Sequence, residues 1–85
     1  MGFEMKVSLP RDVRYVATAR LIAAESAREA GCNGAPAEAF AVSVEDAART
    51  CLSASPSDPH VTMAVAREQD ALVVTIDHHV MRLAL

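Results

Sequence analysis

The spacing of apolar residues changes along the chain, and this change constrains the fold more than any other feature. Near the N-terminus, polar and apolar residues alternate, and the apolar positions are Phe3, Met5, Val7 and Leu9. A period of two is typical of a strand that buries one face. Pro10 ends the alternation. We therefore expect a half-buried strand here.

Apolar residues then recur every three or four positions, which predicts a first helix. Its predicted apolar stripe consists of Val13, Val16, Ala17, Leu21 and Ala24. Asp12 precedes the stripe and is expected as the N-cap, because its carboxylate can accept hydrogen bonds from the free amides of the first turn. Gly31 suits the position after the helix, since glycine adopts positive φ at low cost.

A second helix is predicted after this loop. Pro36 suits its first turn, where a missing N–H group is not needed. Its predicted apolar stripe consists of Phe40, Val44, Ala47, Ala48 and Cys51. The helix should end near Ala54, because the prolines at 56 and 59 cannot continue it.

The C-terminal third returns to a period of two. Residues 61–65 and 72–76 alternate between apolar positions and smaller or polar ones, and the polar segment 67–70 separates them. This pattern predicts a β-hairpin. The tail from His78 to Leu85 is compatible with a further strand or with a short helix.

The expected order is strand, helix, helix, strand, strand in one domain, residues 1–85. An α+β two-layer sandwich accommodates this order, with both helices on one face of a small antiparallel or mixed sheet. Hydrophobic residues make up 52% of the chain, but only three residues are aromatic. The core is therefore expected to consist of aliphatic side chains and closely packed alanine.

Charge and cysteine content narrow the function classes. The net charge of −3 argues against a nucleic-acid-binding module, which usually carries a basic surface. No apolar run is long enough to cross a membrane, so we expect a cytoplasmic protein. Cys32 and Cys51 are expected as free thiols that pack in the fold. The adjacent histidines, His78 and His79, would point to opposite faces of a strand, so no metal site is predicted.

Three segments together resemble a known family. They are Val-Ser-Leu-Pro at 7–10, Phe-Ala-Val-Ser-Val-Glu-Asp-Ala-Ala-Arg at 40–49 and Ala-Leu-Val-Val-Thr-Ile-Asp at 71–77. They are similar to the first strand, second helix and adenine-pocket strand of the anti-sigma-factor serine kinases, in the histidine-kinase-like (GHKL) ATPase superfamily. The resemblance covers most of this chain but only about half to two-thirds of a typical family member.

The resemblance also implies which residues would bind a nucleotide. In the family, a glutamate of the second helix is followed four residues later by a magnesium-binding asparagine. Glu45 matches the glutamate, but Arg49 stands at the asparagine position. A guanidinium has no acceptor and repels a cation, so we expect a Glu45–Arg49 ion pair instead. Asp77 matches the aspartate that binds adenine, whereas His79 replaces the glycine that follows it.

The expected function is that of a degenerate ATPase-fold regulator of anti-sigma type, without a cofactor and without kinase activity. Its partner would be a protein, such as a sigma factor or an anti-sigma antagonist. Arg14, Arg20 and Arg28 are the predicted partner surface, and a solvated helix face is an equal alternative. A homodimer through the edge strand or the tail strand is also compatible. Two other functions stay open: a serine kinase that still binds ATP, and a structural or assembly module.

Overall fold

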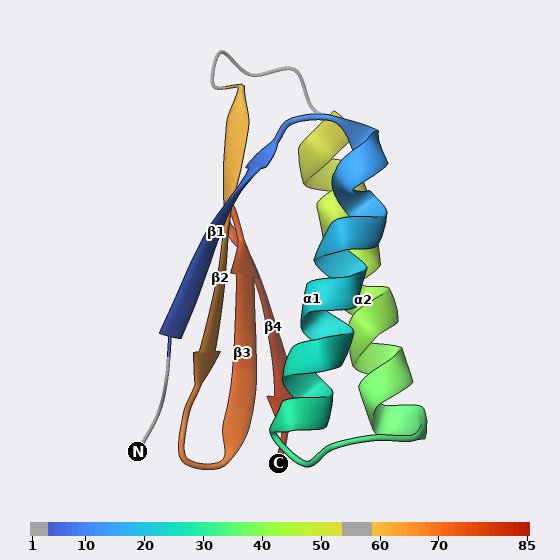
Figure 1. Ribbon diagram of the computed structural model, residues 1–85, viewed down its shortest axis with the longest axis vertical. Helices are drawn as coiled ribbons and strands as arrows, with labels where there is room; N and C mark the ends of the chain where they lie inside the picture. Colours follow the sequence, from blue (N-terminus) through green and yellow to red (C-terminus); the bar gives the residue numbers. More distant parts are fainter. Residues whose placement is uncertain (1–3, 54–58) are drawn as a thin grey trace.

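The computed structural model describes residues 4–53 and 59–85, and these form two layers. One layer is a sheet with strand order β1-β2-β3-β4, in which every neighbouring pair is antiparallel. The other layer is a pair of helices on one face of that sheet (Figure 1). The strands are β1 (Glu4–Pro10), β2 (His60–Arg67), β3 (Ala71–Ile76) and β4 (His79–Ala84). The helices are α1 (Val16–Glu29) and α2 (Ala35–Ser53). The predicted α+β two-layer sandwich is confirmed.

The tail was compatible with a strand or a short helix, and in the structure it forms a fourth strand, β4. Asp77 and His78 link β3 to β4, and Ile76 pairs with His79 at the start of the hairpin. Asp77 adopts a φ of +56°, a left-handed conformation that Asp tolerates better than most residues. The hairpin of β2 and β3 is also confirmed.

Alternation along the strands places one row of side chains from each strand under the helices. The fully buried members of this layer are Met63 and Val65 of β2 and Leu72, Val74 and Ile76 of β3. These residues belong to the two central strands, which are covered by helices and flanked by neighbours on both sides. The edge strands bury less, and Met5 of β1 remains 38% exposed.

The predicted apolar stripe of α1 is wrong in most positions. Val16 is buried, but Ala17 is exposed, and Val13 and Leu21 expose 54% and 60% of their surface. The buried stripe is instead Val16, Ala19, Ala23, Ser26 and Ala27. Three of these are alanines with no exposed surface. Small side chains occupy this face because α1 packs closely on both α2 and the sheet, whereas hydrophobicity alone favours the larger Leu21.

The start of α1 differs in detail from the prediction. Asp12 is an N-cap, and its side chain accepts a hydrogen bond from the Arg14 amide at 2.9 Å. It caps a short 3-10 turn, Val13–Tyr15, that leads into α1. The 3-10 turn explains why Val13 lies off the buried face, because a 3-10 helix has fewer residues per turn than an α-helix and so places side chains at different angles.

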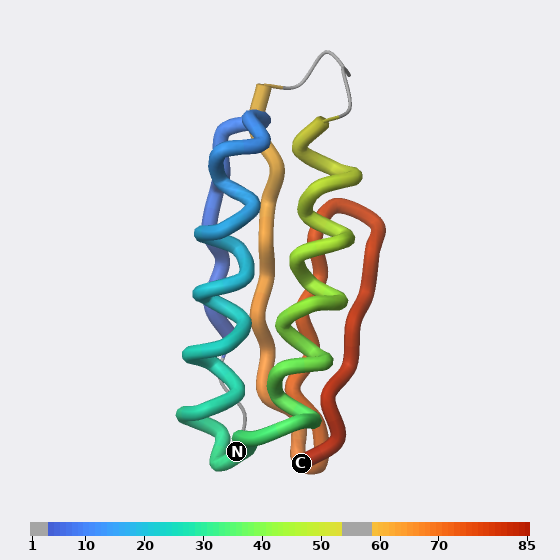
Figure 2. The backbone as a smooth tube through the Cα atoms, turned by 90° about the vertical axis from the view of Figure 1, so that its right-hand side faces the viewer, coloured from blue at the N-terminus to red at the C-terminus, as the bar shows by residue number. Residues whose placement is uncertain are grey.

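The second helix follows its predicted stripe. Phe40, Val44, Ala47, Ala48 and Cys51 are all buried. Its predicted end near Ala54 lies outside the described residues. Figure 2 shows α2 over the β3–β4 half of the sheet and α1 towards β1 and β2. Over the residues described, neither helix is long and apolar enough to cross a membrane.

Candidate functional site

Glu45 lies at the centre of an ion-pair cluster that joins the two helices. Its Oε1 atom is 2.8 Å from Nη1 of Arg20 on α1, and its Oε2 atom is 3.2 Å from Nη2 of Arg49. The Arg20 guanidinium also binds Glu38. The expected Glu45–Arg49 pair is therefore present, and the pairing with Arg20 is a contact that sequence reasoning missed.

The cluster leaves Glu45 poorly suited to a nucleotide site. Both of its carboxylate oxygens face guanidinium groups, and its side chain is only 23% exposed. The pKa of Arg20 is raised, first by its hydrogen bond to Glu45 and then by the charges of Glu38 and Glu45. The carboxylate is therefore held as a partner of two permanent cations.

Asp77, which the resemblance places at the adenine pocket, lies in the turn between β3 and β4. Its backbone N–H donates to the Thr62 carbonyl at 3.3 Å, and its carboxylate lies 3.7 Å from Nε2 of exposed His78. The two pockets described below include neither Asp77, Glu45 nor Arg49. The three positions that the resemblance groups together do not line a common pocket among these two.

The three arginines of the predicted partner surface all have acidic partners within the chain. Arg14 pairs with Asp12 at 2.8 Å, and Arg28 pairs with Glu25 at 3.1 Å. Arg20 belongs to the Glu45 cluster. Because each positive charge is balanced locally, the arginines do not form a strongly basic surface.

A buried cysteine contacts a histidine at the β4 end of the core. Cys51 is 4% exposed, and its Sγ atom lies 3.3 Å from Nδ1 of His79 and 3.7 Å from the carbonyl of Ile76. The pKa of Cys51 is raised, mainly by burial and then by the Asp77 carboxylate, while Arg11 opposes this effect. A thiolate is the reactive form of cysteine, so this environment indicates a packing residue.

Among residues 4–53 and 59–85, no cluster of three or more His, Cys, Asp or Glu side chains could hold a metal ion.

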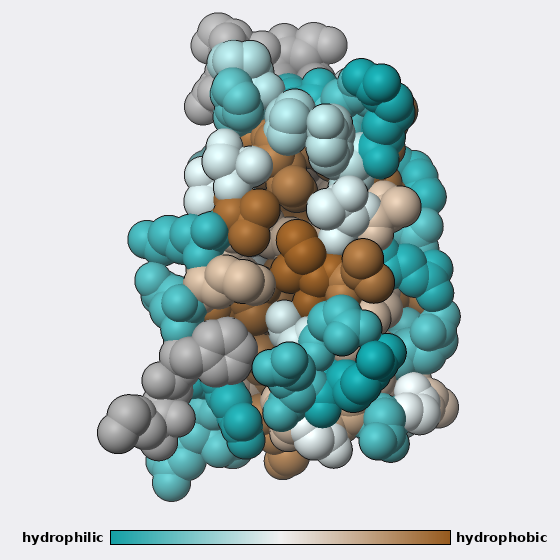
Figure 3. Space-filling model, in the orientation of Figure 1, coloured by the Kyte–Doolittle hydropathy of each residue, from teal (hydrophilic) through white to brown (hydrophobic). Residues whose placement is uncertain are grey.

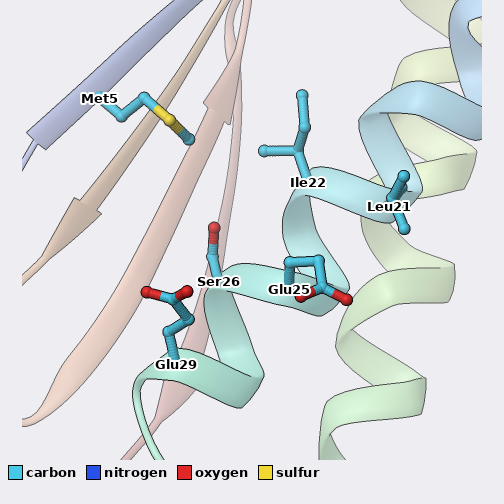
Figure 4. A pocket seen from close by; sticks show the side chains of 6 residues that line it. All are labelled: Met5, Leu21, Ile22, Glu25, Ser26 and Glu29. Atoms are coloured by element: carbon cyan, nitrogen blue, oxygen red, sulfur yellow. The ribbon is translucent and has the colours of Figure 1, made fainter.

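A groove of about 350 Å³ lies between β1 and α1. It is lined by Met5, Leu21, Ile22, Glu25, Ser26 and Glu29. Figure 4 shows Met5 reaching from the strand and Ile22 from the helix towards the space between them, with the Glu29 carboxylate on the strand side of the helix. Figure 3 shows apolar side chains gathered in the middle of this face, with hydrophilic side chains around them.

A second groove of about 330 Å³ lies between α2 and the other edge strand, β4. Its walls include Phe40 and Ser43 of α2 and Met81 and Arg82 of β4. Arg82 already pairs with Glu68 at 3.1 Å. This groove is thus balanced in charge, whereas the first has carboxylates on its helix wall.

Sequence reasoning missed the first groove because it placed Leu21 in the core. A signal was available in the alanines at 19, 23 and 27, which define an alternative stripe at a spacing of four. Packing that stripe inward turns Leu21 outward.

Comparison with protein-family models, with curated proteins and with solved structures finds no match for this chain.

Proposed function

We propose that this chain is a cytoplasmic regulatory protein of anti-sigma type that acts by binding a partner protein and has no kinase activity. The observation that carries partner binding is the groove beside β1, where Met5 and Leu21 are exposed next to an open sheet edge. The anti-sigma type rests on the resemblance of residues 7–10, 40–49 and 71–77. Apolar side chains gathered at the surface often mark a protein interaction site. The free thiols of Cys32 and Cys51 favour a reducing compartment.

The placement of the nucleotide-site positions supports a regulator over a kinase. Arg20 and Arg49 form ion pairs with the two carboxylate oxygens of Glu45. The guanidinium of Arg49 lies at the position where the family has a magnesium ligand, and it carries a permanent positive charge. Asp77 lies in a turn and is not part of either groove.

Isothermal titration with ATP and ADP, with and without magnesium, tests the loss of nucleotide binding. We expect no heat of binding at protein concentrations that would detect a Kd of about 1 mM. Clear magnesium-dependent binding would contradict this proposal and favour the alternative, an active serine kinase.

Affinity capture with matched variants tests the protein-binding function. Leu21→Asp places a charge in the groove, and Val42→Asp places the same charge on α2 at a residue that is 39% exposed. We expect the wild-type chain and Val42→Asp to bind the same partner protein with equal affinity. Leu21→Asp should bind it at least about tenfold more weakly, a loss of about 1.4 kcal/mol.

Circular dichroism should first establish that both variants are folded. Equal affinity of all three chains would overturn the role of the groove. A captured sigma factor or anti-sigma antagonist would support the anti-sigma type, whereas another class of partner would contradict that part alone. A defined oligomer that binds no other protein would favour the structural module.

A further inference from the structure

The edge strand β1 has backbone groups that face away from the sheet. The amide of Arg11 donates to the carbonyl of Pro59 at 2.8 Å, and this pair continues the β1–β2 register. Hydrogen-bonded pairs alternate with non-bonded pairs in an antiparallel ladder. The N–H and C=O groups of Glu4, Lys6 and Ser8 therefore point to the open edge, while the residues between them bond to β2.

The groove lies directly beside this edge. Successive side chains of a strand point to opposite faces, so a strand added to β1 would direct every second side chain towards the helix layer. Met5, Leu21 and Ile22 would meet those side chains. The open edge would supply backbone hydrogen bonds, and the groove would select apolar side chains.

The charge of the groove specifies a further feature of the added strand. Glu25 and Glu29 lie on its helix wall. Glu25 pairs with Arg28 at 3.1 Å, whereas Glu29 has no ion-pair partner among the residues that the structure describes. A basic side chain on the groove side of the incoming strand would complement Glu29.

We propose that β1 and its groove bind an extended segment of a partner protein as a fifth strand, with alternating apolar residues and one basic residue opposite Glu29. This inference rests on the proposed function and names the chemistry of the partner. A second copy of β1 fits less well, because its helix-facing residues Met5, Val7 and Leu9 include no base.

The probe is the capped peptide Thr-Val-Thr-Val-Thr-Lys-Thr. In antiparallel addition its valines and lysine face the groove, and the lysine lies at the end where β1 begins. The C-terminal end of α1, with Glu29, lies at that same end (Figure 1). One control peptide has glutamate in place of lysine. A second control has N-methyl groups on the two central threonines. These groups remove the peptide N–H groups that would donate hydrogen bonds to the carbonyls of β1.

The readout is amide hydrogen exchange measured by NMR on the full chain. In the free chain, the amides of Glu4, Lys6 and Ser8 should exchange quickly, because they face solvent. The lysine peptide should slow their exchange by about tenfold or more at saturation. The N-methylated peptide should give no protection.

Charge exchange tests the basic residue. The glutamate peptide should bind about two- to fivefold more weakly than the lysine peptide, as expected for a partly exposed ion pair. The variant Glu29→Lys should reverse that order. Equal affinity of both peptides for both chains would overturn the proposed basic residue.

The remaining outcomes separate this inference from the proposed function. Methyl shifts at Leu21 and Ile22 without amide protection of β1 would show binding in the groove but not as a strand. Absence of binding by every peptide would also overturn strand addition. Protection that rises with protein concentration, without peptide, would assign the edge to a second copy. In each case the protein-binding part of the proposed function still stands if Leu21→Asp loses affinity for the captured protein and Val42→Asp does not.

Discussion

Nη1 of Arg20 lies 2.8 Å from Oε1 of Glu45, and this ion pair joins two helices across 25 residues of sequence. Arg49 lies 3.2 Å from the second oxygen of the same carboxylate. Glu45 thus pairs with an arginine of each helix, and the cluster connects α1 to α2.

The Arg20–Glu45 pair should contribute to stability through an interaction that salt weakens. We expect Arg20→Gln and Glu45→Gln each to lower Tm, with less than additive loss in the double variant. Raising the salt concentration to about 1 M, where the Debye length is about 3 Å, should reduce the coupling. Thermal unfolding of the four chains measures it. Arg28→Gln, at an exposed pair on the same helix, is the control, and additive effects of Arg20 and Glu45 would contradict the prediction.

The alanine face of α1 should not tolerate enlargement. Ala23 has no exposed surface, and Ala23→Leu would force α1 away from the sheet or from α2. We expect a loss of about 1–3 kcal/mol in the free energy of unfolding, measured by urea denaturation. Ala17→Leu introduces the same side chain at an exposed position of α1 and should change little. Equal stability of the two variants would mean that α1 does not pack closely along this face.

The buried thiol should make stability depend on pH in the alkaline range. Burial, followed by the charge of Asp77, raises the pKa of Cys51, while Arg11 opposes this effect. The folded chain therefore retains the Cys51 proton at a pH where the unfolded chain loses it. Since the folded state binds more protons there, the free energy of unfolding should fall as pH rises above about 8.5.

Urea denaturation between about pH 7.5 and 9.5, with reductant present, measures this slope. Cys51→Val should flatten it, because the titrating group is absent from both states. Cys32→Ser retains Cys51 and should preserve it. A slope that is unchanged in Cys51→Val would assign the pH dependence to another group.

The free energy of unfolding should depend on which backbone conformations residue 77, in the turn between β3 and β4, can adopt. Asp77 has a φ of +56°. Glycine adopts such angles freely, so Asp77→Gly should leave stability unchanged or slightly higher. Asp77→Val should lose about 1–2 kcal/mol, because a β-branched residue is strained in this conformation. Chemical denaturation of both variants checks the difference, and equal effects would show that the turn relaxes to negative φ.

The sequence predicted the layers of this fold because they depend on local periodicity. Alternation in β2 and β3 and the stripe of α2 each place enough apolar residues on one face to decide what is buried. The conformation of the tail could not be predicted in the same way, because it depends on pairing with a neighbouring strand, β3. Its strand forms because β3 offers a free edge and Asp77 adopts the turn geometry.

The sequence by itself determined the two helices and the first three strands, the apolar face of α2 and the Glu45–Arg49 pair, because these follow from spacing within one element. Only the tertiary structure decided which face of α1 is buried, since the close approach of α2 and the sheet selects Ala19 and Ala23 and turns Leu21 outward. This orientation of α1 leaves the groove beside β1. It also brings Arg20 to Glu45, a contact between elements that no local pattern specifies.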